Sequence, residues 1–157
     1  MKQVFSLGMA FSVALSLSVF SAAAAESCAD EASVQRVEQQ IADKQQQAKA
    51  RELQQQAELT KVLATEKLKK NWDDLKVQQV FAALMAEKEF MALEQQKKPQ
   101  TSALIKLIRQ LRSSKQGERD LAKECQQAQQ ITEILDNILK VNQQQYQWML
   151  RHIQQTP

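Results

Sequence analysis

The chain has 157 residues, with 21 lysines and arginines against 18 aspartates and glutamates, which gives a formal charge of +3. This length suits one domain of ordinary size. A charge so close to zero, without a groove-reading motif, argues against nucleic acid as a partner. Only 2 glycines and 2 prolines are present, and these residues are the usual punctuation of sheets and turns. The composition therefore predicts an all-α protein.

Residues 1–25 have the pattern of a secretory signal peptide. Lys2 is followed by an apolar run over residues 4–20, and small residues then lead up to Ala25. We expect cleavage after Ala25, so that residues 26–157 form one helical domain in the periplasm. An uncleaved anchor helix is the alternative, although the apolar run is shorter than the ~20 residues that a bilayer requires.

Both cysteines of the chain, Cys28 and Cys125, lie in the predicted mature protein. In an oxidising compartment, an even number of cysteines favours a disulfide. We therefore expect Cys28 to pair with Cys125 within one chain, with an intermolecular bridge or free thiols as the alternatives. The chain-entropy model gives up to ~4–5 kcal/mol of stabilisation for closing a loop of roughly a hundred residues.

The first predicted helix covers about residues 30–70. Its apolar stripe begins at Val34 and thins over residues 48–57, and two runs of three glutamines lie along it. These glutamines indicate a solvated helix face or, alternatively, a surface for self-association. Lysines up to Lys70 favour a helix end there, and Asn71 is a good N-cap. We expect a tight turn near residue 70, with one uninterrupted helix as the alternative.

Residues 71–115 are predicted to form a second helical segment that bends at Pro99, because proline kinks a helix or begins a new one. The stretch from Trp72 to Leu93 is the most apolar part of this segment, and we expect it to form the middle of the core. Its main apolar residues are Leu75, Val77, Val80, Phe81, Leu84, Met85, Phe90 and Met91.

The third predicted helix, residues 118–155, carries a stripe with alternating steps of four and three residues. This spacing is typical of helices that pack side by side in a coiled coil. Asn142 lies in the stripe, where it either fixes register and oligomeric state or meets water as the bundle loosens. The stripe consists of Leu121, Cys125, Ala128, Thr132, Leu135, Leu139, Asn142, Tyr146, Met149 and Ile153.

The three segments have nearly equal lengths, which predicts an elongated, coiled-coil-like three-helix bundle. In an up-down-up arrangement, the first and third helices begin at the same end, and Cys28 then lies beside Cys125. A four-helix arrangement with a reversal at Pro99 would leave these cysteines roughly 30 Å apart. The cysteines therefore favour three helices with a bend at Pro99.

Few residues of the chain are suited to catalysis. His152 is the single histidine, and there is neither a glycine-rich phosphate loop nor a cluster of His, Cys and carboxylates with metal-ligand spacing. We expect no enzymatic activity, no cofactor, no metal and no small-molecule substrate. A haem carrier that holds iron between His152 and either Met85 or Met91 is a hypothesis ranked below all others.

Four side chains are candidate partner contacts. Lys106, Arg109 and Arg112 belong to a basic amphipathic segment without acidic residues, which suits an acidic partner or an anionic membrane surface. A solvated face over a buried apolar stripe is the plainer interpretation. Trp148 lies off the heptad stripe, so it either anchors a partner or packs against the turn near Trp72.

The sequence thus predicts an exported periplasmic helical binding module, such as a chaperone-like, adaptor or envelope-assembly protein. Its expected partner is another envelope protein or a second copy of itself. The alternative is a structural or surface-associated protein whose basic segment binds anionic lipid or glycan.

Overall fold

A computed structural model describes residue 28, residues 30–115 and residues 119–157, and every described element is helical. The elements are α1 (Glu31–Lys69), α2 (Asp74–Ala86), α3 (Lys88–Ser114) and α4 (Leu121–Gln155). The all-α prediction is confirmed, but four helices stand where the sequence predicted three. The predicted signal peptide, residues 1–25, lies outside the described residues.

Three aspartates begin helices through the same local contact. The Asp30 carboxylate accepts a hydrogen bond from the Ser33 backbone N–H at 2.7 Å, and Asp73 and Asp120 cap α2 and α4 in the same way. A carboxylate at this position satisfies one of the free N–H groups of the first turn and suits the helix dipole. Short-range chemistry thus fixes three of the four helix starts.

The predicted turn near residue 70 is confirmed. α1 ends with Lys67 and Lys69 in its last turn, where cations suit the negative end of the helix dipole. Asn71 has a positive φ of 52°, a region that asparagine tolerates better than most residues. Asn71 therefore turns the chain, and Asp73, instead of Asn71, is the N-cap of the next helix.

The break in the second helical segment lies at Glu87 and not at the predicted Pro99. Glu87 has an extended backbone, with φ −63° and ψ 141°, whereas Pro99 is an exposed residue inside α3. Leu84 and Phe90 are both buried although six residues separate them, a spacing that puts them on different faces of one continuous helix. The break at Glu87 turns both side chains to the same core.

The break also exposes residues that the sequence assigned to the middle of the core. Met91 is 42% exposed, beside the buried Phe90, and Leu75 and Met85 are 61% and 41% exposed. In this stretch the buried apolar residues are Trp72, Val80, Leu84 and Phe90. The prediction that Leu75, Met85 and Met91 lie in the core is therefore wrong.

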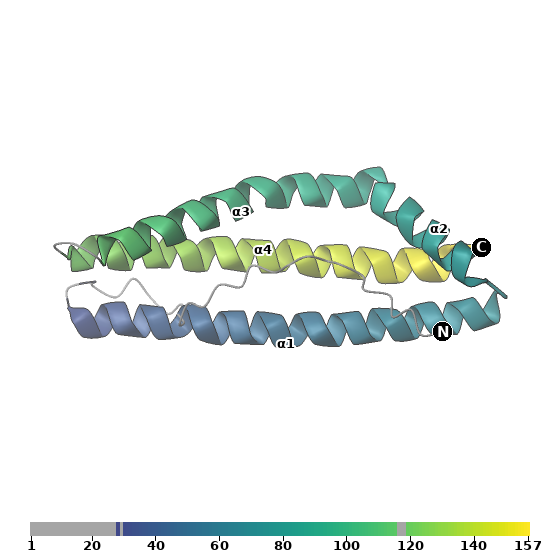
Figure 1. Ribbon diagram of the computed structural model, residues 1–157, viewed down its shortest axis with the longest axis horizontal. Helices are drawn as coiled ribbons and strands as arrows, with labels where there is room; N and C mark the ends of the chain where they lie inside the picture. The colour runs from purple at the N-terminus through teal and green to yellow at the C-terminus, as the bar shows by residue number, and fades with distance from the viewer. Residues whose placement is uncertain (1–27, 29, 116–118) are drawn as a thin grey trace.

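α4 is the central helix of the molecule, with α1 along one side and α3 along the other (Figure 1). α4 packs against α1, α2 and α3, and the break between α2 and α3 does not reverse the path of the chain (Figure 1). At 1.5 Å per residue, the 39 residues of α1 span about 58 Å and the 35 residues of α4 about 52 Å. α1 and α4 are thus nearly equal in length, as predicted, whereas the 13 residues of α2 and the 27 of α3 divide the segment between them.

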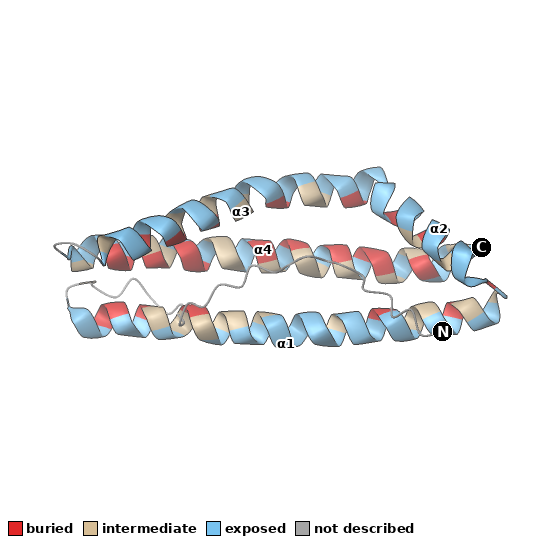
Figure 2. Ribbon diagram, in the orientation of Figure 1, coloured by how far each residue is buried: buried red, intermediate tan, exposed pale blue. Residues whose placement is uncertain are grey.

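Two separate apolar clusters hold the helices together, and the buried residues of α1 lie towards its two ends (Figure 2). Cluster A joins α1, α3 and α4 and consists of Val34, Val37, Ile41, Leu104, Ile108, Leu111, Cys125, Ala128, Ile131 and Ile138. Cluster B joins all four helices and the α1–α2 turn and consists of Leu59, Trp72, Val80, Leu84, Phe90, Trp148, Met149 and Ile153.

The two ends of α1 are tied to α4 by different means. At one end, Cys28 and Cys125 form a disulfide, with their Cα atoms 5.6 Å apart, as the sequence predicted. At the other end, the Lys70 ammonium donates to the carbonyl of Gln154 at 2.9 Å and to that of Thr156. Lys70 thereby satisfies carbonyl groups that have no partner within the last turn of a helix.

Removing the disulfide should destabilise the protein without changing its helices. The bridge spans a sequence separation of 97 residues, so we expect the double variant C28S/C125S to lose about 4 kcal/mol of unfolding free energy, because its unfolded chain is less constrained. Urea unfolding followed by circular dichroism measures this loss. The oxidised and reduced wild-type proteins are the controls, and equal stability of the two would contradict the prediction.

Candidate functional site

The middle of α1 lacks the apolar contacts that hold its two ends. Ile41 and Leu59 are buried, but no residue of α1 between them is buried. Leu53 lies in this stretch and is 58% exposed. On α4 the stripe residues Leu135 and Leu139 are consequently only half-buried, because α1 presents polar and small side chains to them. The predicted heptad stripe is thus incompletely covered between clusters A and B.

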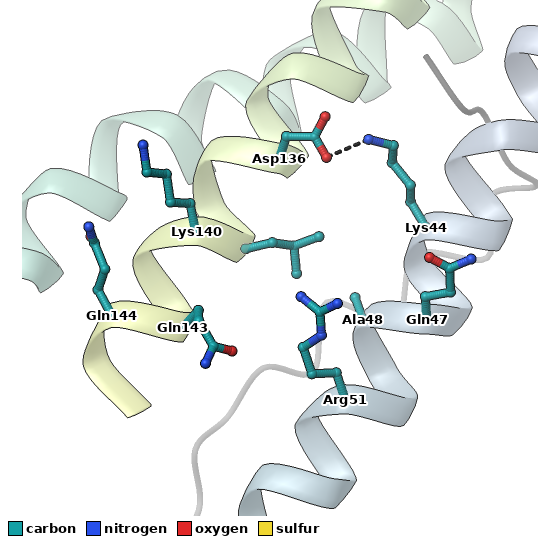
Figure 3. Close-up of a pocket in the computed structure, with 9 residues that line it drawn as sticks. Lys44, Gln47, Ala48, Arg51, Asp136, Lys140, Gln143 and Gln144 are labelled. Carbon is teal, nitrogen blue, oxygen red and sulfur yellow. Dashed lines mark hydrogen bonds and ion pairs between the residues drawn. The ribbon is translucent and has the colours of Figure 1, made fainter. Parts of the chain in front are cut away.

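A groove of about 490 Å³ opens at this place between α1 and α4 (Figure 3). Two of its lining residues are apolar, Ala48 and Leu139, and the others carry charges or amides. We call it the waist groove, and its lining consists of Lys44, Gln47, Ala48, Arg51, Asp136, Leu139, Lys140, Gln143 and Gln144. The volume lies within the range of protein sites that bind small ligands or individual side chains.

An ion pair and a hydrogen bond join α1 and α4, the two walls of the waist groove. The Lys44 ammonium reaches across to the Asp136 carboxylate in an ion pair (Figure 3). Further along, the Gln55 amide nitrogen donates to the Gln143 amide oxygen at 2.6 Å. Exposed ion pairs of this kind stabilise a protein by at most about 1 kcal/mol. The middle of α1 is therefore held weakly compared with its ends.

The lining has more positive than negative charge. Lys44, Arg51 and Lys140 are cationic and Asp136 is the single acid. Asp136 already pairs with Lys44, so its charge is neutralised. The groove therefore offers anion-binding groups beside a small apolar floor.

Beyond the groove residues of α4, Tyr146 lies near Glu58 of α1. Burial raises the pKa of the Tyr146 phenol to about 12, and the negative charge of Glu58 acts in the same direction. Tyr146 packs against cluster B. The phenol therefore stays neutral at physiological pH. Along α4, Tyr146 lies at the boundary between the groove residues and cluster B.

On the opposite side of α4, a buried polar network joins α4 to α3. The Lys97 ammonium donates to Glu94 at 2.6 Å and to the amide oxygen of Gln145 at 3.0 Å, and the Gln145 amide nitrogen donates to Glu94 at 2.7 Å. Lys97 is 6% exposed and Gln145 is 5% exposed. Partial burial opposes ionisation of Glu94, but the bonds from Lys97 and Gln145 hold its pKa below the ordinary value.

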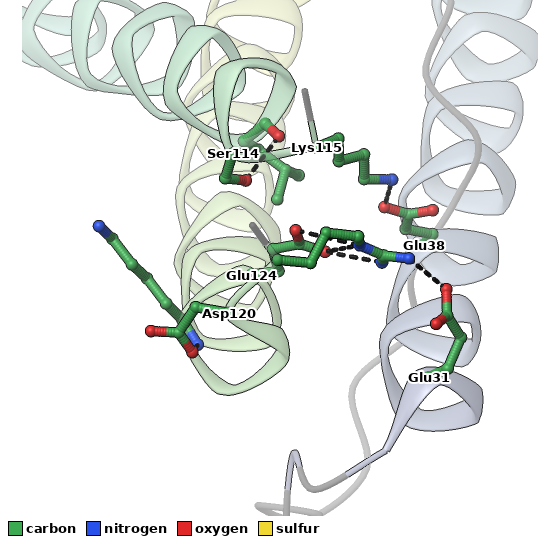
Figure 4. Close-up of polar contacts among 9 residues, drawn as sticks. Glu31, Glu38, Ser114, Lys115, Asp120 and Glu124 are labelled. Carbon is green, nitrogen blue, oxygen red and sulfur yellow. Dashed lines mark hydrogen bonds and ion pairs between the residues drawn. The ribbon is translucent and has the colours of Figure 1, made fainter. Parts of the chain in front are cut away.

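A second charged network closes the end of the molecule that contains the disulfide (Figure 4). Glu124 is fully buried, and the Arg119 guanidinium donates to it at 2.8 Å and also reaches Glu31 of α1. Lys115 pairs with Glu38 beside it. Hydrogen bonds to Glu124 and Glu31 raise the pKa of Arg119, so its guanidinium stays charged at every physiological pH. We assign these residues a structural role.

The three predicted cationic contacts lie on α3, and the fourth predicted contact, Trp148, lies on α4. Lys106, Arg109 and Arg112 lie exposed on α3, opposite the buried Leu104, Ile108 and Leu111, and none of the three lines the waist groove. Asn142 is half-buried beside the waist groove residue Gln143.

Trp148 is not an exposed anchor for a partner. It is 4% exposed, lies in cluster B together with Trp72, and donates its indole N–H to Glu89 at 2.7 Å. α4 needs a buried face towards α3 as well as one towards α1, and Trp148 lies on the α3 face. The expectation that Trp148 is exposed is therefore wrong, and the alternative, that Trp148 packs near Trp72, agrees with the structure.

The residues named for the haem hypothesis have other surroundings. His152 stacks on Trp148 with ring centroids 3.8 Å apart, and its Nδ1 lies 2.8 Å from the Trp148 carbonyl oxygen. Met85 and Met91 are exposed on α2 and α3. Over the described ranges, no group of three or more His, Cys, Asp or Glu side chains is placed to hold a metal ion.

Sequence reasoning missed the waist groove, although the signal was present. The apolar stripe of the first helix thins over residues 48–57, which is where the structure opens. The sequence gives no reason to single out Arg51 or Lys140, because single cations on a helix are ordinarily solvated. Only the pairing of α1 with α4 brings them to one site.

None of the described helices is both long and apolar enough to cross a membrane. Comparison of the chain with protein-family models, with curated proteins and with solved structures finds no match.

Replacing the buried ammonium of Lys97 should test the network between α3 and α4. The variant Lys97→Met removes two hydrogen bonds from an enclosed site, so we expect the free energy of unfolding to fall by about 1–3 kcal/mol. Lys98→Met is the matched control, because Lys98 is exposed and should change stability by less than about 0.5 kcal/mol. Urea unfolding followed by tryptophan fluorescence measures both, and equal effects would contradict a special role for Lys97.

Proposed function

We propose that this protein is an exported, non-catalytic helical binding module of the periplasm that holds a partner protein in the waist groove. One observation carries the proposal: α4 has a continuous heptad stripe, but α1 leaves that stripe half covered between clusters A and B. An incompletely covered stripe can accept side chains from another chain in the manner of a helix groove. Chaperone-like, adaptor and envelope-assembly roles all use such a surface.

Export is supported by two features of the chain. Its first 25 residues have the composition of a signal peptide, and its two cysteines are joined, which is typical of proteins in oxidising compartments. The partner is then another envelope protein or a second copy of this chain.

Photo-crosslinking in the source cell tests this proposal. A photoreactive amino acid replaces Gln47 or Gln144, which line the groove, and Gln95, an exposed glutamine of α3, is the matched control. We expect the two groove positions to form adducts with the same envelope protein, identified by mass spectrometry, and Gln95 to form none. Identical adducts from all three positions, or no protein adducts from the groove, would contradict the proposal.

The exposed basic face of α3 supports a second candidate function. Lys106, Arg109 and Arg112 form no ion pair with any described residue. Several free cations on one helix face attract an anionic membrane surface. In this candidate the protein is surface-associated and rests on lipid through α3.

Vesicle sedimentation tests the second candidate. We expect binding to vesicles that contain phosphatidylglycerol, with weaker binding at higher salt because the charges are screened. The double variant R109Q/R112Q should bind about thirtyfold more weakly, since each of the two cations near an anionic surface contributes about 1 kcal/mol. Arg51→Gln, which lies outside this face, is the control, and equal binding by both variants would rule out a specific role for α3.

A further inference from the structure

The charges of the waist groove identify the kind of segment that fits it. Lys44 is occupied by Asp136, but Arg51 and Lys140 form no ion pair with any residue in the described part of the chain. Arg51 thus remains for a ligand in the groove, whereas the Lys140 side chain extends away from α1 (Figure 3). Charge complementarity favours an anionic group on the partner.

Arg51 is placed to receive that group. Its guanidinium extends from α1 into the space in front of α4, between Ala48 and Gln143 (Figure 3). A guanidinium presents a planar fork of N–H donors that matches a carboxylate with two parallel hydrogen bonds. A neutral carbonyl group can also accept hydrogen bonds from this fork, but bonds to a carboxylate are about twice as strong, so Arg51 contributes most with a negatively charged ligand.

The floor of the groove calls for an apolar side chain beside the anion. Leu139 and Ala48 are half-buried and line the groove, and covering this surface removes it from water. The amides of Gln47 and Gln143 border the same space and can bond to a peptide backbone. A volume of about 490 Å³ admits a few side chains of a segment instead of a whole helix.

We propose that the waist groove binds an acidic segment of the partner protein, in which a carboxylate pairs with Arg51 and a neighbouring aliphatic side chain packs on Leu139. The inference rests on the proposed binding function and adds the chemistry of the partner. The recognition elements are the guanidinium of Arg51 and the apolar surface of Leu139 and Ala48.

Fluorescence anisotropy with designed peptides tests the inference on the purified protein. The probe is a fluorescein-labelled 14-residue peptide of leucine and glutamate at helical spacing, and its partner peptide has glutamine in place of every glutamate. We expect saturable binding of the acidic peptide, at least tenfold tighter than binding of the glutamine peptide. Arg51→Gln should weaken binding of the acidic peptide at least tenfold and leave the glutamine peptide unaffected.

The control variant is Arg151→Gln, which removes an exposed arginine of α4 outside the groove and should leave both affinities unchanged. Leu139→Ala should weaken binding of both peptides equally, because it removes part of the apolar floor. Equal binding of the two peptides, no saturable binding of either, or an equal effect of Arg51→Gln and Arg151→Gln would overturn the inference. Groove crosslinks to a partner segment without acidic residues would overturn it as well and leave the binding function standing.

Discussion

The structure depends on the requirement that α4 pack on two sides at once. α1 and α3 both lie along it, so α4 must bury one face against each neighbour. Residues of the heptad stripe such as Cys125, Ala128, Met149 and Ile153 are buried, and so are Ile131, Ile138, Val141 and Trp148, which lie off that stripe. A single heptad stripe serves a helix with one partner, whereas the wider buried surface of α4 makes it the centre of the molecule.

The two neighbours of α4 satisfy this requirement unequally. α3 packs against the middle of α4, where Lys97 donates a buried hydrogen bond to Gln145. Val141 and Gln145 are therefore shielded from solvent there. α1 offers small and polar side chains over the same stretch and is joined to α4 by Lys44 and Gln55. The waist groove exists because the apolar stripe of α1 is interrupted in the middle of the helix, whereas the stripe of α4 continues there.

Much of the fold follows from the sequence through short-range chemistry. The all-helical class, the turn near residue 70 and the pairing of Cys28 with Cys125 were predicted from composition, charge at helix ends and helix length. The break at Glu87 was not, because it contains neither glycine nor proline. Leu84 and Phe90 would lie on different faces of one continuous helix, yet both are buried in the same core. The need for a break between them can be recognised only once that shared core is known.

The candidate site was harder to predict, because it is made by two helices that are distant in the sequence. Arg51 and Leu139 acquire a common role only when α1 lies against α4. Trp148 was misplaced for a related reason, since an aromatic residue off one stripe belongs to the second buried face of α4. The single heptad stripe predicted for α4 accounts for the misplacement of Trp148, and the distance in sequence between α1 and α4 accounts for the missed groove.

The ends of α1 cannot slide along α4, because a disulfide fixes one end and Lys70 holds the last carbonyl groups of α4 at the other. Between these anchors, α1 is a rod joined to α4 through exposed polar side chains. The waist groove therefore has a fixed length and an adjustable width. It can widen to admit thicker side chains, but the same anchors limit how many residues of a partner segment it can hold at one time.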